Sequence, residues 1–385
     1  MKKRILFISY VYLDYHMCKI SRFNILDNLS DIGHQSFLYA ACLKSKNVLK
    51  NSDKFIQFHS SVPGVQLLNF LTYQLKSIFR IPYLIFNNKI DTVICDINST
   101  PAILPLLILK KIGVIDTVFV LDFRSNILHN RKNVLQSLLK SLYLNIFIKL
   151  SSIMYDGFTF ISHSMKKYIV KKYHIKINKS AIWSSGVSND FLVNKNPMNK
   201  SEFIIFHHGS LERGRGIIRL INAMPLIKLK FKRDIKLIIA GNGSLEGLIK
   251  KKSTNKEYRL DFKGQLHQKE IIQLIDSSSI CLAPFDNSVA NATSSPLKLM
   301  EYIARDKIIY ATELSNFKES FSDYTGLHFL KSNNSENIAI ELENFFLNYE
   351  DYFSKNKNNG RDIIMNDYTW LIQAKKIDNF IKKLY

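Results

Sequence analysis

The stretch SICLAPFDNSVANATSSPLKLMEY, residues 279–302, contains the pattern on which the fold assignment rests. Residues 279–283 form an apolar run typical of a buried strand, and the two serines and the proline at 294–296 suit the N-cap and first turn of a helix. Lys298 and Glu301 then lie three positions apart on one face of that helix. A cation beside a helix N-terminus suits a phosphate, and a carboxylate one turn later can accept hydrogen bonds from sugar hydroxyls.

The same alternation of strand and helix runs through the whole chain. In the first half, strands are expected over 5–9, 36–40, 92–96, 117–121 and 157–162, with helices over 17–32, 100–111, 134–150 and 164–172. In the second half, strands are expected over 203–207, 236–240, 259–263, 279–283 and 307–311, with helices from Ile217, over 268–276 and after Pro296. This pattern predicts an α/β protein of two doubly wound, Rossmann-like domains in tandem.

Length and charge support two domains. The chain has 385 residues and a formal net charge of +22. Residues 1–200 hold 27 Lys and Arg against 10 Asp and no Glu, whereas residues 201–385 hold 27 against 22 acids. The change in composition predicts a boundary near the polar segment 194–200, and the basic first domain is expected to meet something anionic.

Several classes of protein are disfavoured by the sequence. The four cysteines, at positions 18, 42, 95 and 281, have no metal-binding spacing and are expected to be reduced thiols of a cytoplasmic protein. The apolar N-terminal run soon reaches Asp14 and His16 without a cleavage site, so it is interpreted as a first strand and not a signal peptide. No apolar run approaches the ~18 residues that a membrane span needs.

Two glycine-rich loops follow strands in the second half. HGSLERGRG, residues 208–216, combines three glycines with two arginines suited to phosphate, at a strand end where parallel sheets bind ligands. It lacks the spacing of a P-loop. GNGSLEG, residues 241–247, has its third glycine one position late for a dinucleotide fingerprint, so it is interpreted as a lesser wall of the same cleft.

Taken together, these segments resemble retaining glycosyltransferases of the GT-B fold, specifically family 4. SGVS at 185–188 with Phe191, the loop 208–216, LIIAGNGSLEGL at 237–248, FKGQL at 262–266 and SSPLKLMEYIA at 294–304 match five family motifs in order. The resemblance implies two Rossmann-like domains facing across a cleft: an acceptor domain over 1–195, a nucleotide-sugar domain over 196–366, and a helix over 367–385 that crosses back to the first domain.

The resemblance also assigns roles to residues. Glu301 matches the glutamate that binds the nucleotide ribose, Arg215 matches the residue that neutralises the diphosphate, and Gly209 lets the loop approach the donor. The nucleotide-sugar site predicted in this way comprises Gly209, Ser210, Arg215, Gly241, Gly264, Gln265, Leu266, Ser294, Ser295, Lys298 and Glu301.

The chain departs from the family pattern at two positions. Ser210 stands where the family usually has an arginine, and Thr293 stands where a glutamate faces the donor sugar. Lys298 is expected to supply the missing positive charge. Arg215, Lys298 and the helix N-terminus would then stabilise the leaving diphosphate of a UDP- or GDP-sugar, without a metal, another cofactor or an enzymic nucleophile.

The acceptor is expected to meet the first domain. Asp122 and Arg124 follow the strand at 117–121, as Asp14 and His16 follow the first strand. Asp122 and His16 are therefore candidates to orient the acceptor hydroxyl, with a solvated loop residue as the alternative for each. His163 is interpreted as a helix-entry residue.

Segments 67–86 and 134–150 carry apolar residues at helical spacing, interrupted by Lys76, Arg80, Lys140 and Lys149. Core packing explains the apolar residues most simply, and an anionic membrane surface is the alternative partner. The function expected is transfer of a hexose to a glycan or polyprenyl-diphosphate-linked acceptor in capsule or O-antigen synthesis, by an enzyme that is cytoplasmic or peripheral on the membrane. The alternatives are a nucleotide-sugar epimerase, a basic nucleic-acid-binding protein and a non-catalytic relative.

Overall fold

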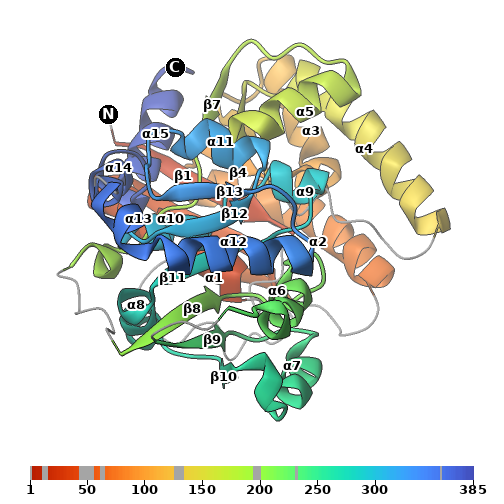
Figure 1. The fold of residues 1–385 in the computed structure, drawn as a ribbon. Coiled ribbons are helices and arrows are strands. Elements are labelled where there is room, and N and C mark those ends of the chain that lie inside the picture. The colour runs from red at the N-terminus through yellow and green to blue at the C-terminus, as the bar shows by residue number, and fades with distance from the viewer. Residues whose placement is uncertain are drawn as a thin grey trace. The chain divides into compact units, whose positions relative to one another are not determined.

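A computed structural model describes residues 2–10, 16–42, 56–60, 66–124, 134–193, 201–229, 233–355 and 358–385 of the chain. The chain divides into two compact units (Figure 1). The first consists of Met1–Gly186 together with Trp370–Tyr385, and the second of Val187–Thr369. No helix in the described part of the chain is long and apolar enough to cross a membrane.

The first unit is built on a parallel sheet of seven described strands in the order β3-β2-β1-β4-β5-β6-β7. Its strands are β1 (Arg4–Ser9), β2 (Gln35–Cys42), β3 (Ile56–Ser60), β4 (Thr92–Cys95), β5 (Val118–Phe123), β6 (Gly157–Phe160) and β7 (Ser180–Ile182). Its helices are α1 (His16–Asp31), α2 (Gln66–Asn87), α3 (Thr100–Lys111), α4 (Val134–Met154), α5 (His163–Tyr173) and α15 (Trp370–Lys382).

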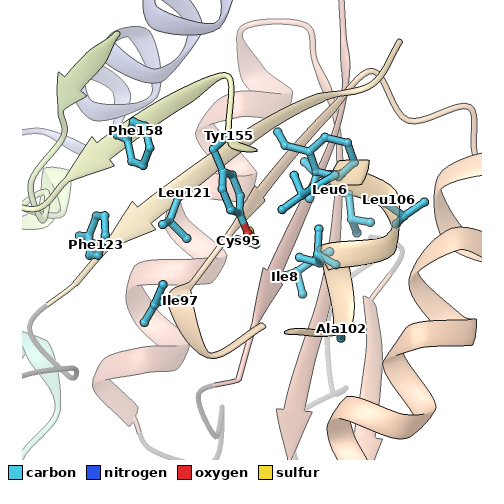
Figure 2. Packing of buried hydrophobic residues seen from close by; sticks show 14 of the residues in the cluster. Leu6, Ile8, Cys95, Ile97, Ala102, Leu106, Leu121, Phe123, Tyr155 and Phe158 are labelled. Atoms are coloured by element: carbon cyan, nitrogen blue, oxygen red, sulfur yellow. The ribbon is translucent and has the colours of Figure 1, made fainter. Parts of the chain in front are cut away.

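Apolar side chains cover both faces of this sheet, as parallel sheets require. Figure 2 shows one face, where Leu6 and Ile8 of β1 and Leu121 of β5 pack with Ala102 and Leu106 of α3. On the other face, Ile5 and Phe7 pack with Leu26 of α1 and with Trp370 and Phe380 of α15. Alternate residues of β1 therefore point to opposite helical layers.

The last helix belongs to the first unit because its apolar side completes that core. Helix α15 packs against α1, and Asp378 accepts from His34 Nε2 at 2.9 Å. A side chain at position 157 would overlap the ring of Phe380, with a Cβ 2.7 Å from its Cζ atom, so Gly157 lets α15 lie close to β6.

The second unit has a parallel sheet of six described strands in the order β10-β9-β8-β11-β12-β13. Its strands are β8 (Glu202–His208), β9 (Asp234–Ala240), β10 (Leu260–Gly264), β11 (Ile280–Ala283), β12 (Ile309–Thr312) and β13 (Leu327–Leu330). Its helices are α6 (Ile217–Ala223), α7 (Glu246–Ser253), α8 (Gln268–Ser277), α9 (Val289–Ala292), α10 (Leu297–Ala304), α11 (Ser315–Phe321), α12 (Ser335–Leu347), α13 (Tyr349–Lys355) and α14 (Gly360–Asp367).

The predicted fold class is confirmed, since each unit is a doubly wound α/β sheet. The strands that the sequence did not reveal, β3, β7 and β13, all lie at sheet edges. All three residues of β7 and three of the four in β13 are only partly buried, which weakens the apolar pattern that marks a strand.

The unit boundaries differ from the boundaries predicted at 195/196 and 366/367. Val187 pairs with Thr369, and Phe191 is buried in a core cluster of the second unit, so the second unit begins before the polar segment 194–200. That segment lies outside the described residues. Side-chain packing of Val187 and Phe191 therefore sets where the second unit begins.

Candidate functional site

The strand order of the second sheet reverses between β8 and β11. Strands β9 and β10 lie on one side of β8, and strands β11 to β13 lie on the other side. Ligands of doubly wound sheets bind at the carboxyl ends of strands at such a switch point. His207 and His208 end β8, and the loop after β11 leads through α9 to α10. The residues predicted to bind the donor phosphates and ribose belong to these segments.

Lys298, in the first turn of α10, is held by a histidine. Its Nζ lies 3.0 Å from His207 Nε2, while His207 Nδ1 lies 2.8 Å from the carbonyl oxygen of Leu282. Because that carbonyl can only accept, Nδ1 carries the proton and Nε2 accepts from the lysine. Burial, with the nearby charge of Lys298, holds the pKa of His207 well below its usual range, consistent with a neutral imidazole.

Arg215 lies near the same lysine. The guanidinium carbon of Arg215 and the ammonium of Lys298 lie 5.1 Å and 5.2 Å from the centre of the Phe285 ring. Burial and the charge of Arg215 lower the pKa of Lys298 well below its usual value, and Glu301 opposes that shift. Two cations near one aromatic ring, partly withdrawn from water, form a site that favours a multiply charged anion.

A polar scaffold orients Arg215. Its Nη1 donates to Asn291 Oδ1 at 3.2 Å, and the amide nitrogen of Asn291 donates to the carbonyl oxygens of Gly214 (3.2 Å) and Asp286 (2.9 Å). Asp286 also pairs with Arg219. Helix α9 thereby fixes the loop that carries Arg215.

Glu301 lies one turn after Lys298, beside a second histidine. Its Oε2 lies 3.3 Å from His208 Nε2, yet that nitrogen has no hydrogen-bond partner among the described residues. Burial raises the pKa of Glu301 to about 8, and burial together with Lys298 lowers the pKa of His208 to about 3. Both groups are therefore held in their neutral forms near pH 7, and their polar atoms remain available for a ligand hydroxyl.

The two predicted glycine positions in the strand-end loops have different roles. Gly209 has φ +111°, and a Cβ there would lie 3.3 Å from Cε of Lys298. Gly241 has φ +138°, and a Cβ there would lie 1.9 Å from the carbonyl oxygen of Gly209. Gly209 therefore makes room beside the lysine, while Gly241 lets the β9 loop pack onto the β8 loop.

Three predicted residues at the end of β10 lie farther along the sheet. Gly264 accepts from Gly241 N at 2.6 Å, and Gln265 accepts from the amide of Asn242 at 3.0 Å. Leu266 is partly buried against a core cluster. Since β9 lies between β10 and β8, these residues adjoin the β9 loop.

The predicted N-cap of α10 is wrong. Helix α10 begins at Leu297 with Pro296 at its N-cap, and no side chain caps it. Ser294 Oγ instead donates to the carbonyl of Asn291 at 2.9 Å, and Ser295 O accepts from Leu297 N at 3.1 Å. The serines form a turn between α9 and α10, because α9 ends at Ala292 and leaves carbonyls to satisfy.

Ser210 and Thr293 are the two positions that depart from the family pattern. Ser210 follows Gly209 in the loop after β8 and is partly buried. Thr293 is buried, and its hydroxyl donates to the carbonyl of Val289 at 2.7 Å. The threonine side chain thus has a local partner at the end of α9.

Asp122 of the first unit lies within β5 and not after it, which corrects the predicted strand end. Its carboxylate is buried and accepts from Arg124 Nε (3.0 Å) and Thr159 Oγ1 (2.8 Å), with Arg22 Nη1 at 3.4 Å. Arg124 stacks on Trp183, 3.2 Å from the ring centre. These contacts make Asp122 the centre of a buried ionic cluster.

The other candidates of the first unit are placed only in part. His16 is the first residue of α1, but its side chain is outside the described set, as is the whole of Asp14. His163 begins α5 after the Ser162 cap, which confirms its interpretation as a helix-entry residue. Within the described ranges, no group of three His, Cys, Asp or Glu side chains could hold a metal ion.

Sequence reasoning missed the roles of His207, His208, Phe285 and Asn291. The signal was a pair of histidines at the end of an otherwise apolar strand, since polar residues there face a ligand edge more often than a core. Phe285 and Asn291 gave no comparable signal, because their contacts with Arg215 depend on how the loop after β11 folds.

Comparisons with known proteins show which family model and which solved folds this chain resembles. Residues 188–362 match the family model described as glycosyl transferases group 1. The solved structures similar to this chain include a glycosyltransferase from Rickettsia africae, 17% identical with a TM-score of 0.73, covering 100% of this chain and 98% of that one. The sucrose-phosphate synthase of Thermosynechococcus elongatus is 12% identical with a TM-score of 0.76, covering 100% and 99%.

A third similar structure is HepE of Anabaena in complex with UDP, 12% identical with a TM-score of 0.71 and 100% coverage of both chains. At these identities the likeness shows the fold alone, which is the GT-B fold with two Rossmann-like domains. No curated protein matches the sequence.

Proposed function

We propose that this chain, a glycosyltransferase whose residues 188–362 form a group 1 domain, moves a hexose-type sugar from a nucleoside-diphosphate sugar to a glycan or lipid-linked glycan. The observation that carries the proposal is the convergence of Lys298, Arg215 and Glu301 at the carboxyl ends of β8 and β11. Among the similar solved structures, HepE is in complex with UDP or UDP-glucose, and WaaG is a glycosyltransferase involved in lipopolysaccharide biosynthesis. These similarities support a UDP-sugar donor and a surface-polysaccharide acceptor.

In the proposed complex, the diphosphate lies against Lys298 and Arg215, and the nucleotide ribose donates hydrogen bonds to Glu301. The bond between the sugar C1 and the β-phosphate oxygen breaks, and negative charge grows on the phosphate that leaves. Two cations already oriented by His207 and Asn291 stabilise that charge without reorganising.

The acceptor hydroxyl then forms the new bond to C1 from the side that the phosphate leaves, with retention of configuration, and its proton passes to the departing diphosphate or to solvent. Neither an enzymic nucleophile nor a metal ion takes part in this proposal. Asp122 and His16 remain the proposed acceptor-side residues of the first unit, and the enzyme is proposed to work in the cytoplasm or at its membrane.

Thermal unfolding with a panel of UDP, GDP, CDP, ADP and their sugars tests the proposal, with EDTA and with Mg²⁺. A nucleotide at 100 times its dissociation constant should add about 2.7 kcal/mol to the free energy of unfolding. We expect UDP or GDP to raise the melting temperature equally with and without metal. An unchanged melting temperature with every nucleotide would overturn the proposed donor site. A rise in melting temperature that occurs only with Mg²⁺ would overturn its metal independence.

A further inference from the structure

Helix α2 carries an apolar stripe on the side opposite its core contacts. Its buried positions include Tyr73, Ser77, Ile81 and Leu84. The opposite positions follow at intervals of three or four residues, and each of these apolar side chains is at least half exposed: Leu68, Leu71, Leu75, Phe79, Tyr83 and Phe86. A surface helix of a soluble domain normally places polar residues there, so this stripe needs a partner.

Helix α4 repeats the feature. Val134, Leu138, Leu142 and Ile146 stand at every fourth position, and each is between 51% and 76% exposed. The two helices are neighbours, since α3 packs against both and the rings of Phe70 and Tyr143 meet edge to face at 5.9 Å (Figure 1). Exposed apolar patches of this extent mark interaction sites.

The charges on these helices select the partner. Helices α2, α3 and α4 contain no Asp or Glu, and their charged residues are Lys76, Arg80, Lys110, Lys111, Lys140 and Lys149. Lys149 lies three residues after Ile146, on the neighbouring turn of α4, and Arg80 lies 4.9 Å from the ring centre of Tyr83. A second copy of this chain would bring cations against cations, whereas an anionic surface complements them.

We propose that the apolar stripes of α2 and α4, with Lys76, Arg80 and Lys149 beside them, dock the protein on a bilayer that contains anionic phospholipid. The leucines and the two phenylalanines enter the boundary between headgroups and acyl chains, and the cations lie at the phosphates. Membrane docking would bring the enzyme to a lipid-linked acceptor, and this purpose rests on the proposed function. The docking itself does not depend on it.

Flotation of the full chain with vesicles tests the surface without donor or acceptor. We expect binding to vesicles of phosphatidylcholine with phosphatidylglycerol, weaker binding at higher salt, and little binding to phosphatidylcholine alone. K76Q/R80Q should weaken binding about thirtyfold, the equivalent of ~1 kcal/mol for each cation. L75S/F79S should weaken it roughly tenfold or more.

The control is L248S/I340S, which removes two exposed apolar side chains, 43% and 53% accessible, from α7 and α12 of the second unit. It should bind vesicles as the parent does. The rise in melting temperature on adding nucleotide should be the same in all these variants. Vesicle binding therefore tests the membrane surface, and nucleotide stabilisation separately tests the donor site. Absent vesicle binding, unchanged binding of L75S/F79S, or a dimer that this variant converts to a monomer would overturn the proposal.

Discussion

The ammonium of Lys298 lies 3.0 Å from Nε2 of His207, and the histidine can accept from it because its other nitrogen is engaged by the carbonyl of Leu282. A neutral imidazole thus orients a cation without cancelling its charge. Arg215, near the same Phe285 ring, is oriented in the same way by the neutral amide of Asn291. The site therefore presents two positive charges whose immediate hydrogen-bond partners are uncharged, which leaves both charges for a ligand.

Replacing Lys298 by methionine is expected to lower kcat about 10²–10³-fold, since one electrostatic donor to the leaving group is lost. The melting temperature should stay the same or rise, because burial disfavours the charged lysine. Kinetics of sugar transfer and a thermal melt measure the two effects. Lys250→Met removes an exposed lysine of α7 and should change neither. An unchanged kcat in Lys298→Met would show that the lysine does not face the leaving group.

Replacing Glu301 by alanine should weaken UDP binding at pH 7 by about 0.5–1.5 kcal/mol, the worth of a hydrogen bond between neutral groups, because burial keeps this carboxyl protonated. Titration calorimetry measures this directly, with Glu246→Ala as the control, because the Glu246 carboxylate pairs with Lys250 on the same helix, α7. Equal affinity for UDP in Glu301→Ala and the parent would place the ribose elsewhere.

Glu301 should also give the folded protein a distinct pH dependence. Its pKa is raised from 4.5 to about 8, so between those values the folded state holds a proton that the unfolded state has lost. The free energy of unfolding contributed by this group therefore decreases as the pH rises, by up to about 1.4 kcal/mol per pH unit. His208, with its pKa lowered from 6.5 to about 3, acts in the opposite sense at lower pH.

The difference between the parent and Glu301→Gln isolates this contribution. Urea unfolding from pH 5 to 8 should show the variant gaining stability relative to the parent as the pH rises. A constant difference across this range would mean that Glu301 titrates normally in the folded state.

The sequence was informative about the fold because apolar runs of buried parallel strands are nearly continuous. Strands such as β9, in which four of the last five residues are buried, were predicted within two residues. The edge strands β7 and β13 are only half-buried, and no residue pattern distinguishes them from loops. Which unit a boundary residue such as Phe191 belongs to depends on long-range packing, which spacing along the chain does not contain.

For the candidate site, motif order names the candidate residues, but it does not give the contacts that hold them in place. Lys298 and Glu301 were placed on one helix face by their spacing alone. The acceptor that orients Lys298 is His207, 91 positions away in sequence, and only the pairing of β8 with β11 brings it near. The residue type of Ser294 and Ser295 favours a helix cap. In the structure, the Ser294 hydroxyl instead donates a hydrogen bond to the carbonyl oxygen of Asn291.

Two glycines that share the left-handed backbone region should respond very differently to alanine. A Cβ at Gly241 would overlap the carbonyl oxygen of Gly209, whereas a Cβ at Gly264 meets nothing within 4 Å. Gly264→Ala should therefore cost about 1–2 kcal/mol of stability through its φ of +63° alone. Gly241→Ala should cost about 3 kcal/mol or more and weaken UDP binding, because the loop beside Lys298 must shift. Equal losses in chemical denaturation would contradict this distinction.

The substitution Asp122→Asn tests whether the Asp122 carboxylate acts on the acceptor or stabilises the fold of the first unit. The carboxylate is buried between Arg22 and Arg124, and burial already lowers the pKa of Arg124 to about 10. Removing one partner of a buried ionic cluster leaves two guanidinium groups without their counter-charge, so the free energy of unfolding should fall by about 3–5 kcal/mol. Thr159→Val removes one hydrogen bond to the same carboxylate and should cost only about 1–2 kcal/mol. If Asp122→Asn instead kept its stability and lost sugar transfer, the carboxylate would act on the acceptor, and the surrounding arginines would serve to position it.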